Sequence, residues 1–152
     1  MILFLDFDGV LHPEHEREPT PADRVFCHLP RLETILRDFP RVEVVISSMW
    51  RHDYTLTELR TRFSPDIAAR IIGATPLADY VEGKYVPARR ENEILDWLAL
   101  NLRDGDAWIA LDDAVWQFLR HRDRLVACTS YIGFDDDAEA RLRAALAQVD
   151  DR

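Results

Sequence analysis

The feature that most constrains the fold is a short apolar run near the start of the chain that ends in two aspartates. Residues Ile2–Leu5 are apolar, Asp6 and Asp8 follow one residue apart, and Gly9 comes next. An apolar run of this length before a glycine turn predicts a buried strand. Two carboxylates at its carboxyl end would lie where open α/β sheets bind ligands. Because clustered carboxylates repel each other, they favour a hard divalent cation as their partner.

Further apolar runs alternate with stretches of helical spacing along the chain. Strands are predicted at Ile2–Leu5, Val42–Ile46, Ile71–Gly73, Trp108–Leu111 and Leu125–Cys128. Helices are predicted around residues 32–39, after Thr55 with its capping partner Glu58, with Pro87 in a first turn, and after Asp135. This alternation predicts an α/β domain with a mostly parallel five-stranded sheet. The 152 residues suit one domain that spans residues 1–152.

The charge balance and the N-terminal residues restrict the partners and the compartment. The formal net charge is −9, which argues against nucleic-acid binding through a general basic surface but leaves a local basic patch open. No basic residue precedes the first apolar run, and the run stops at Asp6, so it is expected to be neither a signal peptide nor a membrane span. We therefore expect a cytoplasmic protein with no membrane partner. The sequence leaves the oligomeric state open.

Polar residues end three of the predicted strands. These are Asp6 with Asp8, then Ser47, then Asp112 with Asp113. Taken singly, an aspartate after a strand usually makes a turn, and a serine there usually caps a helix. Because the carboxyl ends of parallel strands lie at one edge of the sheet, the three groups together predict a single site.

Four segments resemble the motifs of the haloacid dehalogenase (HAD) superfamily. Asp6–Leu11 resembles the first motif in its phosphatase form, and Val44–Ser47 resembles the second, a strand that ends in Ser or Thr. Ile109–Asp113 resembles the fourth motif in its paired-acid variant, and Arg90–Leu98 is similar to the helix that carries the third motif's basic residue. The resemblance spans residues 1 to about 146. It implies a three-layer, Rossmann-like α/β fold of the HAD type.

The resemblance also implies a catalytic role for several side chains. Asp6 would be the nucleophile that attacks phosphorus and forms an aspartyl-phosphate. Asp8 would act as general acid on the leaving oxygen and then as base on the hydrolytic water. For this, Asp8 must hold a proton part of the time, which nearby carboxylates would favour. Ser47 would donate a hydrogen bond to a phosphoryl oxygen, and Ser48 is the alternative.

The same resemblance implies a magnesium site. Mg²⁺ would be held by the Asp6 carboxylate, the backbone carbonyl of Asp8 and Asp112, with Asp113 as an additional ligand, directly or through water. A basic residue would offset the charge of the transferred group. Three residues remain open for that role, with Arg90 favoured over Lys84 and with Arg89 adjacent to it; each could also be a solvated surface charge.

The residues that flank the motifs are open to two interpretations. His12 would line the entrance of the site or lie on the surface. Trp50 and Arg51 would offer a stacking and phosphate-binding surface, unless Trp50 is a core residue. The remaining tryptophans are expected in the core: Trp97, Trp108 and Trp116.

The spacing of the motifs leaves no room for a full cap domain. About forty residues separate Asp8 from Ser47, and a similar number separate Ser47 from Arg90, and both stretches must supply strands and helices. Only the polar segment His12–Asp23 and the segment Ala78–Tyr85 would partly cover the site. An open site suits a phosphate on a large molecule, such as a nucleic-acid end or a phosphoprotein. The run of residues 47–51 is similar to that of HAD domains associated with RNA repair, which suggests a polynucleotide 3′-phosphate.

Three functional hypotheses follow from the motifs. The first is a Mg²⁺-dependent phosphomonoesterase that uses Asp6. The second is a non-catalytic phosphate-binding or regulatory module with the same fold, against which the intact pair of Asp6 and Asp8 argues. The third is a receiver domain, but there the phosphorylated aspartate ends a later strand, where this chain has Ser47. Dehalogenase chemistry is disfavoured because Asp8 supplies the acid that a leaving alkoxide needs.

Overall fold

The computed structural model describes residues 1–77 and 84–150, and its strands form one five-stranded sheet. All the pairings between neighbouring strands are parallel, and the strand order is β3-β2-β1-β4-β5. The strands are β1 (Ile2–Leu5), β2 (Glu43–Ile46), β3 (Ile71–Ala74), β4 (Trp108–Asp112) and β5 (Leu125–Ala127). The predicted parallel sheet is therefore confirmed, and each predicted strand lies within one residue of the observed bounds at either end.

The strand order places a switch point beside β1. The chain moves outward from β1 to β2 and β3, and then returns to add β4 on the other side of β1. In open α/β sheets the crevice at such a point, outside the carboxyl ends of the strands, is where ligands bind. Leu5 pairs with Ile46 on one side and with Leu111 on the other. The next residues of these strands therefore meet at one edge: Asp6, Ser47 and Asp112.

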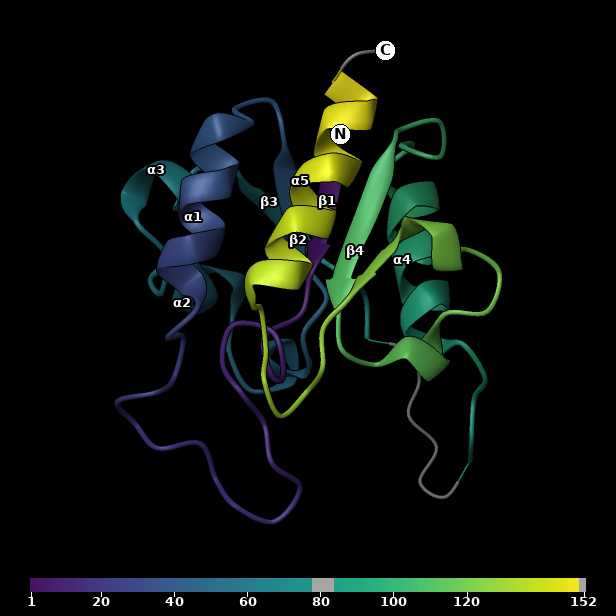
Figure 1. Cartoon of the computed structure of the whole chain (residues 1–152). Helices are drawn as coiled ribbons and strands as arrows, with labels where there is room; N and C mark the ends of the chain where they lie inside the picture. Colours follow the sequence, from purple (N-terminus) through teal and green to yellow (C-terminus); the bar gives the residue numbers. More distant parts are fainter. Residues whose placement is uncertain (78–83, 151–152) are drawn as a thin grey trace.

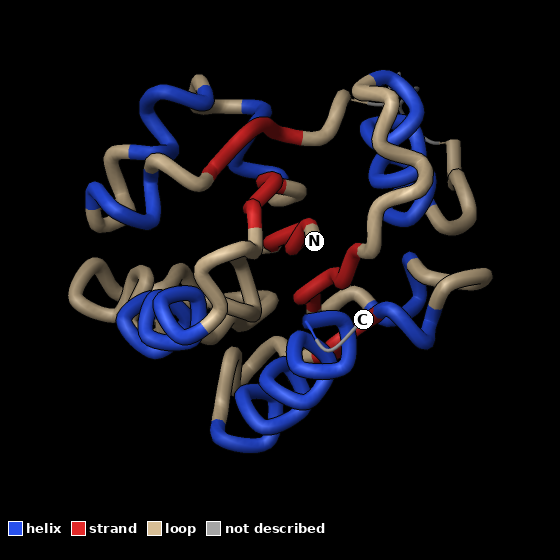
Figure 2. Tube along the Cα trace, turned by 90° about the horizontal axis from the view of Figure 1, so that it is seen from above, coloured by secondary structure: helices blue, strands red, loops and turns tan. Residues whose placement is uncertain are grey.

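Helices cover both faces of the sheet and give the predicted three layers. They are α1 (Leu29–Asp38), α2 (Leu56–Arg60), α3 (Pro65–Ala68), α4 (Arg89–Leu100) and α5 (Asp136–Asp150). Figure 1 shows α1 and α5 in front of the sheet, and Figure 2 shows α4 on the opposite side. The three-layer, Rossmann-like α/β fold is therefore confirmed.

The side chains of β1 are completely buried and alternate between the two faces. Leu3 and Leu5 belong to the apolar core that includes residues of α1 and α5, whereas Phe4 packs on the side of α4. The Phe4 ring contacts the rings of Trp97 and Trp108, with centroids 5.7 and 5.8 Å away. The prediction that these two tryptophans are core residues is confirmed, since both are buried.

Two helix starts test the local predictions. The hydroxyl of Thr55 accepts a hydrogen bond from the backbone N–H of Glu58, and the Glu58 carboxylate accepts one from the N–H of Thr55, so the predicted capping pair is present. The prediction for Pro87 is wrong. Because Ala88 adopts a left-handed conformation with φ of 52°, α4 begins after it at Arg89, and Pro87 lies outside the first turn.

Loops and short 3₁₀ helices follow the strands at the carboxyl edge. In Figure 1 the loop after β1 extends below the tip of β4. Most of residues 13–23 are exposed, as expected, but residues 78–83 of the second expected cover lie outside the described residues. Between the described elements no inserted domain is present, which agrees with the predicted lack of a full cap. Among residues 1–77 and 84–150, no helix combines the length and apolar character needed to cross a membrane.

Candidate active site

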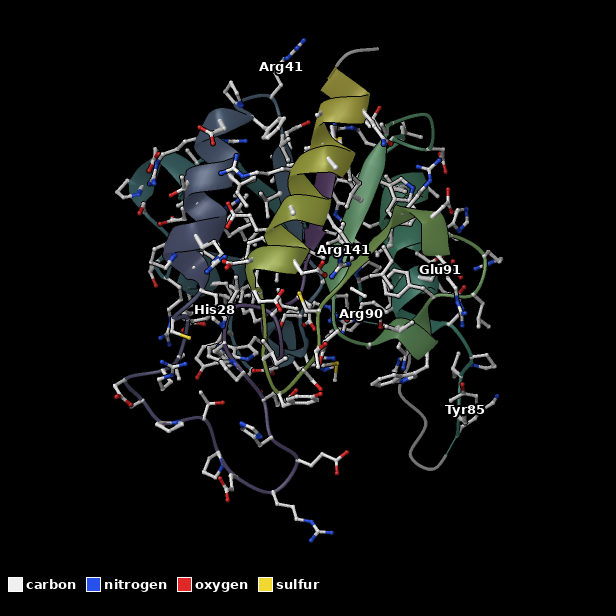
Figure 3. All side chains as sticks on the ribbon, viewed as in Figure 1. His28, Arg41, Tyr85, Arg90, Glu91 and Arg141 are labelled. Atoms are coloured by element: carbon white, nitrogen blue, oxygen red, sulfur yellow. The ribbon has the colours of Figure 1, made fainter. Side chains whose placement is uncertain are left out.

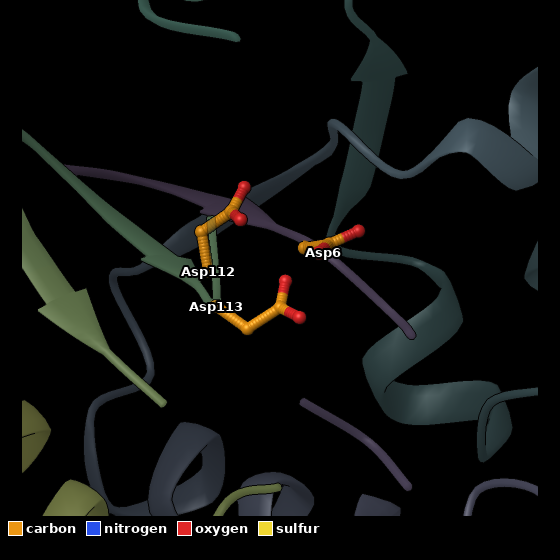
Figure 4. A group of neighbouring side chains, drawn as sticks. All are labelled: Asp6, Asp112 and Asp113. Carbon is orange, nitrogen blue, oxygen red and sulfur yellow. The ribbon is translucent and has the colours of Figure 1, made fainter. Parts of the chain in front are cut away.

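Three aspartates meet at the switch point of the sheet. Asp6 follows β1, Asp112 ends β4 and Asp113 follows it, and each offers a carboxylate oxygen, all within 4.8 Å of one another. Figure 4 shows the three side chains together at the ends of their strands. Asp6 and Asp112 are buried, and Asp113 is half-buried. Three carboxylate oxygens this close are the donor set that a hard cation such as Mg²⁺ prefers.

Burial and mutual repulsion perturb the acidity of all three carboxyls. Burial raises the pKa of Asp6 to about 7, with Asp113 adding to the rise and Arg90 opposing it. Burial, reinforced by the charge of Asp6, also raises the pKa of Asp112 to about 7. For Asp113, burial raises the pKa to about 6. The cluster therefore resists full ionisation until a cation joins it, and this property fits a magnesium site.

Arg90 is the cation that contacts this cluster. Its Nη1 lies 2.9 Å from Oδ2 of Asp112 and 3.3 Å from Oδ1 of Asp6. Burial alone would lower the pKa of Arg90, but Asp112 and Asp6 outweigh it and raise the pKa. Figure 3 shows Arg90 at the end of the sheet where β4 terminates. Of the other candidates, Arg89 lies 3.6 Å from Glu93, and Lys84 is exposed. The geometry therefore favours Arg90.

The two serines after β2 differ in what their hydroxyls contact. Oγ of Ser48 accepts a hydrogen bond from the backbone N–H of Trp50, and so caps the 3₁₀ helix η1 (Met49–His52). Oγ of Ser47 is buried and has no hydrogen-bond partner among the described residues. Ser47 is therefore the hydroxyl that remains available to a ligand. Oγ1 of Thr75, directly after β3, is in the same state. Because Thr75 directly follows a strand, as Ser47 does, the sequence could have indicated it as a candidate site residue.

The side chain of Asp8 lies in a different environment from the three clustered acids. Oδ1 of Asp8 lies 2.8 Å from Nε2 of His12, and the indole N–H of Trp50 donates to both oxygens, at 3.0 and 3.1 Å. Burial would raise the pKa of Asp8, but these hydrogen bonds outweigh it, and the pKa is lowered. The expectation that nearby carboxylates favour a proton on Asp8 part of the time is therefore wrong for the metal-free site, because two donors stabilise its ionised form.

His12 is not a surface residue, and together with Asp8 and Trp50 it lines a second cavity beside the site. It is buried, and its Nδ1 accepts a hydrogen bond from the backbone N–H of Phe26 at 3.2 Å. Because Nδ1 is an acceptor, this pattern assigns the ring hydrogen to Nε2, which donates to Asp8. Trp50 is half-buried. Its ring packs against the ring of Phe26 and stacks on that of Tyr54, with ring centroids 5.1 and 5.5 Å apart. His12 and Trp50 thus hold Asp8 in one orientation, a role that the sequence did not indicate.

Arg51 does not form a phosphate-binding surface, so that interpretation is wrong. Its side chain is 3% exposed, and its Nη2 lies 2.7 Å from Glu93 of α4. Its guanidinium also donates to the carbonyls of Ser47, Ser48 and Thr75. These contacts use the guanidinium to tie the loops after β2 and β3 to α4.

Gly9 allows the loop after β1 to approach Asp113. Its φ is +72°, a backbone conformation that residues other than glycine rarely adopt. A Cβ at this position would lie 2.2 Å from Oδ2 of Asp113. The glycine of the first motif is therefore required both for the turn and for the space that Asp113 occupies.

A cavity of about 350 Å³ opens over these groups. Asp6, Asp8, Asp113 and Arg90 are among its lining residues, and so is Trp116. The prediction that Trp116 is a core residue is wrong, since 61% of it is exposed. The 3₁₀ helix η2 (Val115–Gln117) is followed by Phe118, which is completely buried and takes the core position instead.

This sheet, with acids after β1 and β4 and a basic residue from α4, defines a member of the HAD superfamily. The model of the family described as "HAD domain in Swiss Army Knife RNA repair proteins" matches residues 2–138, and the chain belongs to this family. No curated protein and no solved structure matched the chain at a significant level. Membership confirms the resemblance that the motifs indicated, and it implies a phosphohydrolase-type enzyme family with an association to RNA repair.

Proposed function

We propose that this protein is a Mg²⁺-dependent phosphomonoester hydrolase that works through an aspartyl-phosphate on Asp6. The observation that carries the proposal is the cluster at the switch point. There, carboxylate oxygens of Asp6, Asp112 and Asp113 lie within 4.8 Å of one another. Nη1 of Arg90 lies 3.3 Å from Oδ1 of Asp6. A nucleophile, a cation site and a fixed positive charge are thus within reach of one phosphoryl group.

Each residue of the cluster has a role that follows from its contacts. Asp6 attacks phosphorus, and the bond from phosphorus to the leaving oxygen breaks. Arg90 orients the Asp6 carboxylate and offsets the charge of the phosphoryl oxygens. The unpartnered hydroxyl of Ser47 donates to one of these oxygens. Bound Mg²⁺ would supply further positive charge that holds the phosphate in line with Asp6. Its proposed ligands are the carboxylates of Asp6, Asp112 and Asp113 and the backbone carbonyl of Asp8.

Asp8 would act as general acid when the leaving group departs and as general base when water hydrolyses the aspartyl-phosphate. In the resting site it is a carboxylate, oriented by His12 and Trp50, which suits the base that accepts a proton from the hydrolytic water. To act as acid on the leaving oxygen it must first take up a proton. A phosphomonoester has a second pKa of about 6, so its monoanion carries such a proton at mildly acidic pH.

The proposed substrate is an exposed phosphate on a large molecule, with a nucleic-acid end favoured over a phosphoprotein. The absence of an inserted cap among the described residues supports a large substrate, because the cavity is bordered by α4, the short 3₁₀ helices and loops and not by a separate domain. The family's association with RNA repair supports the nucleic-acid end.

The test compares Asp6→Asn with a matched control, Asp104→Asn. Asp104 is exposed in the turn before β4, at the opposite end of the sheet from the cluster. Hydrolysis of an aryl phosphate is measured with Mg²⁺ and with EDTA, and circular dichroism checks the fold. We expect activity only with Mg²⁺, its loss in Asp6→Asn and full activity in Asp104→Asn. Full activity in Asp6→Asn would refute the proposal. Metal binding without turnover of any phosphoester would support the alternative, a non-catalytic phosphate-binding module.

A further inference from the structure

Two exposed apolar side chains line the cavity that contains Asp6 and Asp8. Trp116 is 61% exposed and Met49 is 52% exposed, and both are lining residues of this cavity. Large apolar side chains in contact with water are common singly, but beside a polar centre they mark binding sites. The mechanism proposed above uses neither of them.

The chain places both side chains close to the reacting groups. Met49 begins η1, directly after Ser47 and Ser48, and Trp116 lies in η2, three residues after Asp113. Buried Phe118 anchors the end of η2. The side chain of Gln117 accepts a hydrogen bond from the backbone N–H of Arg90, at 3.4 Å. Trp116 therefore stands on a segment that is connected to Arg90, the proposed phosphate-orienting residue.

We propose that Trp116 and Met49 form the subsite for the nucleobase of the terminal nucleotide whose phosphate is removed. This inference rests on the proposed function and names the part of the substrate that the enzyme recognises. An indole face stacks on a planar base of any sequence, and a thioether packs against a ring edge. The cavity of about 350 Å³ is at the small end of ligand sites, so it suits one nucleotide rather than a longer stretch.

The charges around the cavity favour recognition of the base over recognition of further phosphates. Five acidic residues line its wall against two arginines, Arg89 and Arg90, and the whole chain carries a net charge of −9. An acidic wall repels neighbouring backbone phosphates. Affinity for the terminal nucleotide must then come from uncharged contacts, and Trp116 offers the largest of them. The same repulsion acts on acidic phosphopeptides, and the family's association with RNA repair favours the nucleotide.

The test uses two oligonucleotides with a terminal phosphate that differ only in whether the last sugar carries a base. The phosphate is placed at the 3′ or the 5′ end, whichever the wild type hydrolyses. The variants are Trp116→Ala, Trp116→Phe, which keeps a ring, and Leu119→Ala. Leu119 is a matched control because it is 54% exposed on the same segment but does not line the cavity.

We expect Trp116→Ala to raise KM about tenfold for the substrate with the base and less than about twofold for the abasic one. Trp116→Phe and Leu119→Ala should stay close to wild type on both. Equal effects on the two substrates would overturn the proposal, as would no effect on either. A phosphotyrosine peptide is assayed as a third substrate. If Trp116→Ala raises KM for this peptide alone, the proposal is also overturned, in favour of a protein substrate.

A binding measurement separates this inference from the proposed function. Adenosine, which carries the base but no phosphate, is titrated in EDTA, with tryptophan fluorescence and calorimetry as readouts. Stacking on Trp116 should quench the wild-type fluorescence, and the quench should be lost in Trp116→Phe while calorimetry still detects binding. If this holds but no phosphoester is hydrolysed, the proposed function fails and the subsite stands. If hydrolysis depends on Asp6 but neither assay shows dependence on the base, the subsite is refuted and the proposed function stands.

Discussion

Replacing Asp6 with asparagine should stabilise the metal-free protein at pH 8 while it removes the proposed nucleophile. Asparagine has nearly the same shape but no charge, so it relieves repulsion from Asp112 and Asp113 within the cluster. Arg90 is not left without a partner, because Asp112 remains 2.9 Å from its Nη1. The substitution thus isolates the cost of ionising a buried carboxyl.

The magnitude follows from the perturbed acidity of Asp6. Burial raises its pKa from 3.8 to about 7, and a shift of roughly three units corresponds to about 4 kcal/mol. The asparagine amide must also be buried, which costs about 2 kcal/mol. We therefore expect a net gain of about 2 kcal/mol, or about 4–8 °C in Tm for a domain of this size.

The pH dependence of this gain has a definite sign. A carboxyl with a raised folded-state pKa binds its proton more tightly in the folded protein, so it destabilises the fold as the pH rises from about 4 to about 7. The gain from Asp6→Asn should therefore be near zero at pH 5 and complete at pH 8. Asp8 provides the opposite control, because its pKa is lowered. Its contribution is present above its unfolded pKa and is lost only at lower pH, so Asp8→Asn should destabilise the protein at both pH values.

The assay is thermal unfolding followed by circular dichroism, at pH 5 and pH 8, with EDTA or with Mg²⁺. Mg²⁺ should raise the Tm of the wild type at pH 8 more than that of Asp6→Asn, because a ligand that binds more tightly stabilises the fold more at the same concentration. The reasoning is refuted if Asp6→Asn loses stability equally at both pH values, or if Mg²⁺ raises both melting temperatures by the same amount.

Two further substitutions test the supports of the site. Trp50→Phe keeps an aromatic ring but removes the donor to both oxygens of Asp8, so kcat for an aryl phosphate should fall about tenfold with little change in KM; an unchanged kcat would show that Trp50 does not position Asp8. Arg51→Ala should destabilise the protein by about 3–5 kcal/mol in urea unfolding, because it leaves buried Glu93 without this partner. A loss below about 1 kcal/mol would contradict the buried ion pair.

The sheet and the position of the site could be predicted because both depend on short-range patterns. Each residue of Ile2–Leu5 is apolar and completely buried, so the strand is visible in the sequence. The rule that parallel strands share a carboxyl edge then brought Asp6 together with Asp112 and Asp113, more than a hundred residues away. Neither step requires knowledge of individual side-chain contacts.

The environment of Asp8 could not be predicted, because distant residues determine it. The donors are His12, fixed by the backbone of Phe26 fourteen residues further on, and Trp50, 42 residues from Asp8. A nearby acid pair suggested a raised pKa, but hydrogen bonds that no sequence pattern indicates lower it. Trp116 was misplaced for a related reason. In an apolar stretch that forms a 3₁₀ turn, helical periodicity does not say which side chain faces inward, and here Phe118 does.

The charges of the cluster explain why a divalent cation suits it and why Arg90 does not make that cation unnecessary. With all three carboxylates ionised, the guanidinium of Arg90 neutralises one charge and leaves two, which one Mg²⁺ balances. Arg90 contacts Asp6 and Asp112, whereas no ion pair joins it to Asp113 among the described contacts. Asp113 instead keeps a raised pKa and sits against Gly9, at the cavity. The residual negative charge is therefore concentrated where a cation can enter from solvent. The instability that Asp6→Asn should relieve is thus the same free energy that favours metal binding.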